Sequence, residues 1–179
     1  AREFAARGAS VVVADVDSDG GTATVDAIED AGGAARFVET DVTDPEAARK
    51  MVDVAVDAFG RLDYAFNNAG IGGAQTPITD YDPDDWQSVI DVNLVGVFNC
   101  LKPEIEQMQS QDDGGAVVNN SSILGQVGFA SSSGYVAAKH GLLGLTKTAA
   151  LENGETGVRV NAVCPGFIET PLLEAGGIT

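Results

Sequence analysis

The stretch SSILGQVGFASSSGYVAAK, residues 121–139, decides how the rest of the chain is interpreted. An apolar run at residues 116–118 leads into Ser121 and Ser122, so a strand is expected to end at these serines. Tyr135 and Lys139 follow four positions apart, and such residues share one face of a helix. The pattern predicts that a phenol, an ammonium group and a serine hydroxyl lie close together.

These three groups suit proton and hydride exchange at a carbinol carbon. A tyrosine with a pKa of about 10 is a poor base at neutral pH, but an ammonium group within ~4–6 Å favours the phenolate and lowers that pKa. A serine hydroxyl stabilises charge that develops on a substrate oxygen. We therefore expect Tyr135 to exchange a proton with an alcohol or carbonyl, Lys139 to lower the tyrosine pKa, and Ser122 to orient the oxygen.

The serine and the Tyr-x-x-x-Lys motif, thirteen residues apart, resemble the signature of the short-chain dehydrogenase/reductase (SDR) family. The resemblance covers about residues 1–170 and includes NNAG at 67–70 and PGFIET at 165–170. It implies an oxidoreductase that transfers hydride between NAD(H) and a secondary alcohol or carbonyl compound. An epimerase or dehydratase with the same Tyr–Lys pair is a further alternative, which the Pro-Gly loop and the serine spacing disfavour.

The resemblance also assigns roles outside the central stretch. Asn93, in DVNL at 91–94, is implied to hold a water that links Lys139 to solvent; the alternative is a polar residue satisfied within its helix. Lys139 is implied to bind the ribose hydroxyls as well. The positions assigned to the cofactor are Asp15, Asp41, Val42, Asn68, Ala69, Gly70, Tyr135, Lys139, Pro165, Gly166, Ile168 and Thr170.

Asp15 ends the apolar run at residues 10–14. In a dinucleotide-binding unit, an acidic residue at the end of the second strand bonds the ribose 2′-hydroxyl, about 20 residues after a glycine-rich phosphate loop. Such a residue repels a 2′-phosphate, so NAD is favoured over NADP. The alternatives are that Asp15 is a solvated strand end or cap and that Asp41 is only a turn residue.

Apolar runs that alternate with helical segments predict one α/β domain, residues 1–179, with a doubly wound, three-layer parallel sheet of Rossmann type. Strands are expected at 10–14, 34–39, 62–66, 116–118 and 158–164, and helices at 19–31, 45–59, from 83 to 109, and from 135 to 151.

Counting back from Asp15 places the phosphate loop before residue 1, so we expect the first strand, the glycine loop and a C-terminal part to be missing. In a 3-2-1-4-5-6 order that strand is central, so a gap is expected between strands 10–14 and 62–66. The alternative to an enzyme is therefore a catalytically inactive fragment or a binding module of the same fold.

The composition excludes several classes of function. A net charge of −17, from 27 acidic and 10 basic residues, opposes nucleic-acid binding. The sequence has no apolar run of the ~20 residues that cross a membrane. The sequence offers no metal ligand set, because its lone histidine, His140, and its two cysteines, Cys100 and Cys164, are far apart in the sequence. Two cysteines in apolar surroundings indicate reduced thiols and therefore a cytoplasmic protein.

The remaining expectations concern partners and surface. A small-molecule alcohol or ketone substrate and a homo-oligomer, a dimer or tetramer, follow from the resemblance alone. The acidity has two open explanations, a surface adapted to high salt or an ordinary acidic enzyme, and activity that rises towards molar salt would favour the first.

Overall fold

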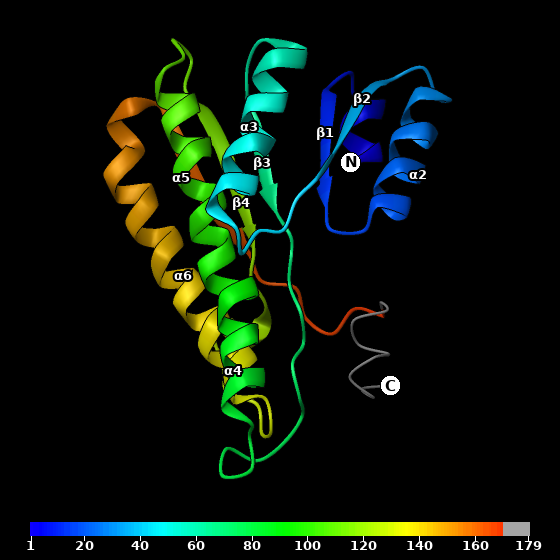
Figure 1. The fold of residues 1–179 in the computed structure, drawn as a ribbon. Coiled ribbons are helices and arrows are strands. Elements are labelled where there is room, and N and C mark those ends of the chain that lie inside the picture. Colours follow the sequence, from blue (N-terminus) through cyan, green and yellow to red (C-terminus); the bar gives the residue numbers. More distant parts are fainter. Residues whose placement is uncertain (170–179) are drawn as a thin grey trace.

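The computed structural model describes residues 1–169, which form two parallel β-sheets and their covering helices (Figure 1). The first sheet and its helices comprise α1 (Arg2–Ala6), β1 (Ser10–Asp15), α2 (Ser18–Glu29) and β2 (Ala34–Glu39). The second part comprises α3 (Pro45–Phe59), β3 (Tyr64–Asn67), α4 (Pro83–Ile90), α5 (Gly96–Gln109), β4 (Gly115–Asn120), α6 (Ser133–Asn153) and β5 (Val158–Val163). Three shorter segments are the π-helix η1 (Asp91–Val95) and the 3-10 helices η2 (Ile123–Gly125) and η3 (Gly154–Thr156).

Local sequence signals set the helix ends. The Asp44 side chain accepts a hydrogen bond from the amide of Glu46 (2.9 Å), and Pro45 occupies the first helical position of α3. Gly60 ends that helix in the left-handed region at φ 83°, a conformation that glycine adopts without a Cβ penalty. Asp82 caps α4 in the same way as Asp44 caps α3. These predicted boundaries are confirmed.

The strands pair in two separate sheets, β1–β2 and β3–β4–β5, all parallel. Within residues 1–169 no ladder joins β1 to β3, so the gap predicted between these strands is confirmed. The Rossmann-like α/β fold with parallel strands and a missing central strand is confirmed as well, because no described strand bridges β1 and β3.

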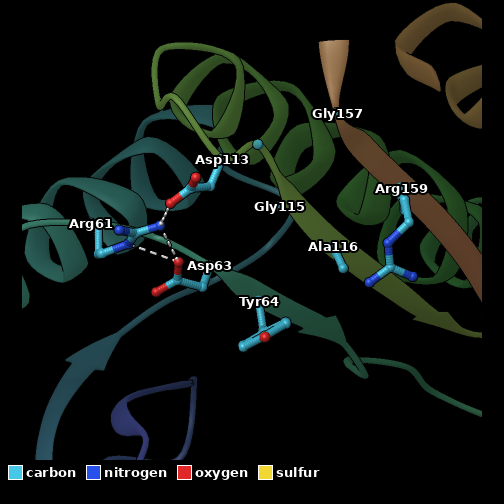
Figure 2. Close-up of a pocket in the computed structure, with 9 residues that line it drawn as sticks. Arg61, Asp63, Tyr64, Asp113, Gly115, Ala116, Gly157 and Arg159 are labelled. Carbon is cyan, nitrogen blue, oxygen red and sulfur yellow. Dashed lines mark hydrogen bonds and ion pairs between the residues drawn. The ribbon is translucent and has the colours of Figure 1, made fainter. Parts of the chain in front are cut away.

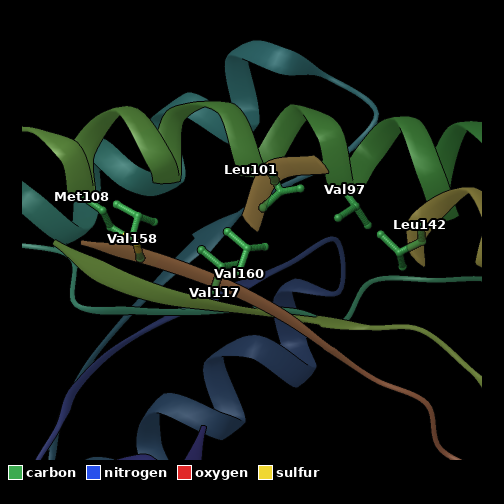
Figure 3. Close-up of a cluster of buried hydrophobic side chains, with 8 residues drawn as sticks. Val97, Leu101, Met108, Val117, Leu142, Val158 and Val160 are labelled. Carbon is green, nitrogen blue, oxygen red and sulfur yellow. The ribbon is translucent and has the colours of Figure 1, made fainter. Parts of the chain in front are cut away.

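The main core lies between the β3–β4–β5 sheet and helices α5 and α6, which cover one of its faces (Figure 3). Its buried members are Val97, Leu101, Met108, Val117, Leu142, Ala149, Val158 and Val160. Burying a valine, leucine or methionine side chain fully contributes about 1.5–3 kcal/mol. Tyr64 and Phe66 alternate with Ala65, which packs on this core, so they lie on the other face and are 63% and 52% exposed.

Parallel pairing brings the carboxyl ends of β3, β4 and β5 to one edge of the second sheet. The segments that follow these strands are 68–70, 121–122 and 164–166, and all of them belong to sequences singled out above. Both cysteines are free thiols, Cys100 buried and Cys164 half-buried. Among the described residues, no helix combines the length and the apolar character needed to cross a bilayer.

Candidate active site

Ser122 and Tyr135 come together as the sequence predicts. Ser122 follows the end of β4, and its Oγ caps η2 by accepting from the amide of Leu124 (3.1 Å). Tyr135 lies in the first turn of α6, close enough to the Ser122 hydroxyl for that group to lower the pKa of its phenol in part. The strand end and the helix start therefore present the two hydroxyl groups to the same space.

Lys139 lies one turn further along α6 and is only 3% exposed. Its Nζ donates to the backbone carbonyl of Asn120 (2.8 Å) and is 5.4 Å from the centroid of the Tyr135 ring. Ser121 Oγ donates to the backbone carbonyl of Lys139 (3.2 Å), which ties α6 to the end of β4. Burial disfavours the ammonium form and lowers the pKa of Lys139 to about 8.

The pKa of Tyr135 differs from the expectation. Burial raises the pKa of the Tyr135 phenol, and the hydrogen bond with Ser122 lowers it in part. Lys139 does not lower the pKa of Tyr135 here, because the lysine ammonium is directed to the Asn120 carbonyl. In this structure the protonated phenol is therefore the favoured form at neutral pH.

Asn93 is fully buried within η1, where the backbone forms a π-turn in place of the continuous α-helix expected from the sequence. Single π-turns occur often at functional sites. The Nδ2 of Asn93 donates to the carbonyls of Ile71 and Val89 (both 2.9 Å). Its Oδ1 is buried without a hydrogen-bond partner among residues 1–169. The alternative, a polar residue satisfied within its helix, therefore explains the amide nitrogen of Asn93 but not the amide oxygen.

The backbone at Gly70 lies close to the side chains of both Asn93 and Lys139. A Cβ atom on Gly70 would lie 2.7 Å from Asn93 Oδ1 and 3.7 Å from Lys139 Nζ. The backbone after β3 therefore approaches both side chains closely, and only glycine leaves the necessary room.

The side chains of Asn67 and Asn68 tie neighbouring strands together. Asn67 Nδ2 donates to Asn119 Oδ1 (3.0 Å), and Asn120 Nδ2 donates to Asn68 Oδ1 (2.8 Å). Asn68, Ala69 and Gly70 are exposed at the edge of the sheet, where small side chains leave the backbone open to a ligand.

The Pro-Gly loop reaches the same edge. The carbonyl of Pro165 accepts from the amide of Ile123 (2.8 Å), which joins this loop to the segment after Ser122. Gly166 is exposed and Ile168 is 58% exposed. Thr170, the last residue assigned to the cofactor, lies outside the described residues.

Asp15 lies in the other sheet, at the carboxyl end of β1. Its exposed carboxylate accepts from the amide of Asp17 (3.1 Å), and its register partner on β2 is Glu39.

Asp41 and Val42 follow β2. Asp41 Oδ1 accepts from both the amide (2.9 Å) and the hydroxyl (2.8 Å) of Thr43, which lowers the pKa of Asp41. An aspartate that accepts from the residue two positions later forms a turn, which is the alternative role stated above for Asp41. Val42 is half-buried and packs against Gly96, where a Cβ atom would lie 2.6 Å from its Cγ2.

Two groups that the sequence interpretation missed support the site. The backbone carbonyl of Asn120 holds Lys139, and backbone roles have no signature in residue types. Glu104 is 1% exposed, and its Oε2 accepts from Asn67 Nδ2 (3.0 Å). Burial raises the pKa of Glu104 to about 7. Its spacing from the core residues Leu101 and Met108 was the available signal, since all three share one face of α5.

A separate pocket of about 300 Å³ opens at the opposite end of the second sheet (Figure 2). Arg61 borders it and bridges Asp63 (2.7 Å) and Asp113 (3.5 Å). The strand residues Tyr64 and Gly115 on its lining begin β3 and β4, so this pocket lies far from the carboxyl-end site. Within residues 1–169, histidine, cysteine, aspartate and glutamate form no group of three that could hold a metal ion.

Known proteins are similar to this chain over most of its length. A family model described as "Enoyl-(Acyl carrier protein) reductase" matches residues 1–178. Over 94% of the chain, 45% of residues are identical to "Short chain dehydrogenase/reductase astE" of Aspergillus oryzae, and over 95% of the chain, 44% are identical to cyclohexanol dehydrogenase of Acinetobacter sp. (strain SE19). The chain spans 65% and 67% of the length of these two relatives.

Two solved structures are also similar. Levodione reductase superposes with a TM-score of 0.93 at 38% identity, over 97% of this chain and 68% of that protein. NAD⁺-bound xylitol dehydrogenase superposes with a TM-score of 0.92 at 34% identity, over 96% of this chain and 66% of that protein.

Proposed function

Because the chain belongs to the short-chain dehydrogenase/reductase family, we propose that it oxidises a secondary alcohol to a ketone with NAD⁺ and catalyses the reverse reduction. The observation that carries this proposal is the convergence of the Ser122 strand end, the Tyr135 ring and the buried ammonium of Lys139, which lies 5.4 Å from the centroid of that ring. A small-molecule substrate would place its oxygen between the two hydroxyl groups.

Tyr135 is the proposed acid and base. In the reduction direction its phenol gives a proton to the carbonyl oxygen, and Ser122 stabilises the charge on that oxygen. In the oxidation direction the phenolate must form first, which the raised pKa of Tyr135 disfavours at neutral pH. Reduction is therefore expected to be fast near neutrality, and oxidation is expected to accelerate at alkaline pH.

Lys139 and Asn93 are proposed to carry the proton to and from solvent. With a pKa of about 8, Lys139 is mostly charged at neutral pH, and it can exchange its protons within an accessible range. The free Oδ1 of Asn93 is a hydrogen-bond acceptor placed beside Gly70, close to the lysine. A bound water that donates to this oxygen would continue the path towards Lys139.

The residues at the carboxyl ends of the strands fit NAD. Bound NAD⁺ would supply the hydride acceptor. We propose that Asp15 holds the adenosine ribose, that Asp41 and Val42 contact the adenine, and that Lys139 and Tyr135 bind the nicotinamide ribose. Asp15 faces Glu39 in the strand register, and two neighbouring carboxylates favour a 2′-hydroxyl over a 2′-phosphate. The remaining proposed contacts are the exposed backbone at Asn68, Ala69 and Gly70 and the loop with Pro165, Gly166, Ile168 and Thr170.

The proposed substrate class is the apolar cyclic alcohols. The rings of Phe129 and Phe167 pack at 5.9 Å between centroids, and the two side chains are 40% and 55% exposed. Phe129 lies on the segment between Ser122 and Tyr135, and Phe167 lies on the Pro-Gly loop. An exposed aromatic pair beside the reacting groups suits a carbocyclic ring, and one relative is a cyclohexanol dehydrogenase.

We also propose that residues 1–179 act as one domain within a homodimer or homotetramer in the cytoplasm. The outer faces of α5 and α6 expose Phe98 (53%) and Leu151 (86%), which supports helix-to-helix contact between copies. Light scattering on the purified protein measures the number of copies.

The function is tested with protein expressed from the complete reading frame. NADH and NADPH are titrated by fluorescence, and cyclohexanol is then offered with NAD⁺. Tighter binding of NADH together with formation of NADH supports the proposal. Binding of NADH without turnover of any cyclic alcohol or ketone would favour the binding module, and absence of binding would reject both.

A further inference from the structure

A chain of buried polar side chains runs through the core beneath the candidate site. Glu104 of α5 accepts from Asn67 of β3 (3.0 Å), and the same Nδ2 also donates to Asn119 of β4 (3.0 Å). Asn119 Nδ2 then donates to Thr146 Oγ1 of α6 (2.9 Å), and this hydroxyl donates to the carbonyl of Leu142 (2.8 Å). These hydrogen bonds join α5, β3, β4 and α6 through neutral side chains, and the carboxyl group of Glu104 stands at one end of the series.

These side chains are placed where a polar group is costly unless it is bonded. Glu104 is 1% exposed, Asn119 is 0%, Thr146 is 5% and Asn67 is 9%. Asn67 can satisfy both Nδ2 hydrogens only with Glu104 and Asn119 together. Removing the carboxyl would therefore leave a buried donor unpaired, and the Asn67 amide would turn to find another acceptor.

The chain adjoins the groups that hold the catalytic lysine. Asn119 precedes Asn120, whose carbonyl receives the Lys139 ammonium (2.8 Å) and whose side chain binds Asn68. Thr146 and Lys139 share α6. A shift of the Asn67–Asn119 contact would thus move both the carbonyl that holds Lys139 and the helix that carries it.

We propose that Glu104 is a positioning residue for Lys139, acting through Asn67 and Asn119 to fix the end of β4 against α6. This inference rests on the proposed function, because Lys139 matters only if the site exchanges protons. The Glu104 carboxyl has no part in the proposed hydride transfer, and the inference gives it a structural role in holding Lys139.

The surroundings of Glu104 make its protonation state adjustable. The titratable neighbour on α5 is Cys100, four residues earlier; burial, and then the charge of Glu104, raise the pKa of that thiol to about 12, so it is neutral. The hydrogen-bonded side chains that lead from Glu104 to β3, β4 and α6 within residues 1–169 are neutral: Asn67, Asn119 and Thr146. Arg49 of α3 and Glu106 of α5 pair with each other at the surface (2.7 Å).

The test compares two replacements of Glu104. Glu104→Gln keeps an oxygen that accepts from Asn67, whereas Glu104→Leu removes it. The first readout is competitive acetylation of the four lysines, Lys50, Lys102, Lys139 and Lys147, followed by mass spectrometry, which needs neither substrate nor coenzyme. The second readout is kcat and KM for a cyclic ketone with NADH.

Glu104→Leu is expected to raise the acetylation rate of Lys139 alone by about tenfold and to lower kcat by about tenfold with little change in KM. Glu104→Gln should stay within about twofold of the parent protein in both readouts, which is rescue by the conservative replacement. Met108→Ala is the matched control, because Met108 is fully buried on the same helix and lies in the apolar core.

The proposal is overturned if Glu104→Leu and Met108→Ala, compared at equal loss of thermal stability, change Lys139 acetylation and kcat equally. If Glu104→Leu does not fold, Glu104→Asp, which withdraws the carboxyl from Asn67 by one methylene, is judged by the same readouts. A parent protein without turnover would reject the proposed function, while the acetylation pattern would still decide whether Glu104 positions Lys139.

Discussion

The two sheets hold their functional side chains in opposite ways. In the β3–β4–β5 part, Asn93, Asn119 and Lys139 are at most 3% exposed and are held by hydrogen bonds to the backbone or to other side chains. In the β1–β2 part, Asp15 and Glu39 are exposed and make few contacts. Among the described residues before Gly60, Thr40 is the one buried polar side chain.

The difference separates chemistry from recognition. A group that must give or take a proton needs a fixed position and a shifted pKa, and both come from burial and hydrogen bonding. A carboxylate that only recognises a ribose hydroxyl needs neither. Substitutions in the second sheet should therefore change turnover and stability together, whereas those in the first sheet should change cofactor choice alone.

The largest effect is expected for Tyr135→Phe. This change removes the proposed acid, which is the phenol hydroxyl, but keeps the ring beside Lys139. We expect kcat to fall about a thousandfold, with coenzyme affinity nearly unchanged. Steady-state kinetics and NADH titration measure the two quantities, and a loss of less than about tenfold would remove Tyr135 from the chemistry.

A smaller loss is expected for Gly70→Ala. The new methyl group would lie 2.7 Å from Asn93 Oδ1, so the asparagine must move away from its place near Lys139. We expect kcat to fall about a hundredfold, because displacements of this size disrupt proton transfer. Gly128→Ala is the control, since a Cβ atom there meets nothing within 4 Å. Equal kinetics for the two variants would contradict the role of the Gly70 contact.

In the first sheet, Asp15→Ala should change only recognition. Its carboxylate is exposed, so we expect the melting temperature to stay constant. The preference for NADH over NADPH should fall about tenfold, because the repulsion of a 2′-phosphate is reduced. Comparative titration with the two coenzymes checks this, and Asp19→Ala, another exposed acidic residue of the same region, is the matched control.

Stability is also expected to depend on pH through Glu104. Burial raises the pKa of Glu104 from 4.5 to about 7, so the folded protein binds this proton more tightly than the unfolded chain does. Stability from this group is present below pH 4.5 and is lost as the pH rises through 7. The parent protein loses this stability between pH 4.5 and pH 8, whereas Glu104→Gln has no carboxyl to titrate. The free energy of unfolding of Glu104→Gln minus that of the parent should therefore increase by about 3 kcal/mol over this range. Urea unfolding at both pH values measures this increase, and parallel pH profiles would contradict it.

Local chemistry made much of the fold predictable. Asp44-Pro45 and Gly60 specify the ends of α3 through a cap, a fixed φ angle and a left-handed turn, and each of these depends on a single residue type. The Tyr135–Lys139 spacing specifies a shared helix face in the same way. Such signals survive in any tertiary context, so the sequence alone suffices to predict them.

Features that depend on tertiary packing were less predictable. Glu104, in the polar-looking stretch KPEIEQM, would ordinarily be a solvated helix residue, and only its neighbours Asn67 and Met108 show that it is buried. The direction of the Tyr135 pKa was wrong in the sequence interpretation, because burial outweighs a lysine whose ammonium binds the Asn120 carbonyl. Contacts of this kind are set by three-dimensional packing, and the one local signal was the spacing of Glu104 from the core residues Leu101 and Met108 on α5.

The most direct test of the central claim is deuterium transfer. Cyclohexanol with deuterium on its carbinol carbon is incubated with NAD⁺ and protein from the complete reading frame, and the reduced coenzyme is analysed by mass spectrometry. We predict deuterated NADH with the parent protein and none with Tyr135→Phe in the same time. If the two proteins form equal amounts of deuterated NADH, the Tyr135–Lys139–Ser122 site is not where hydride transfer is catalysed.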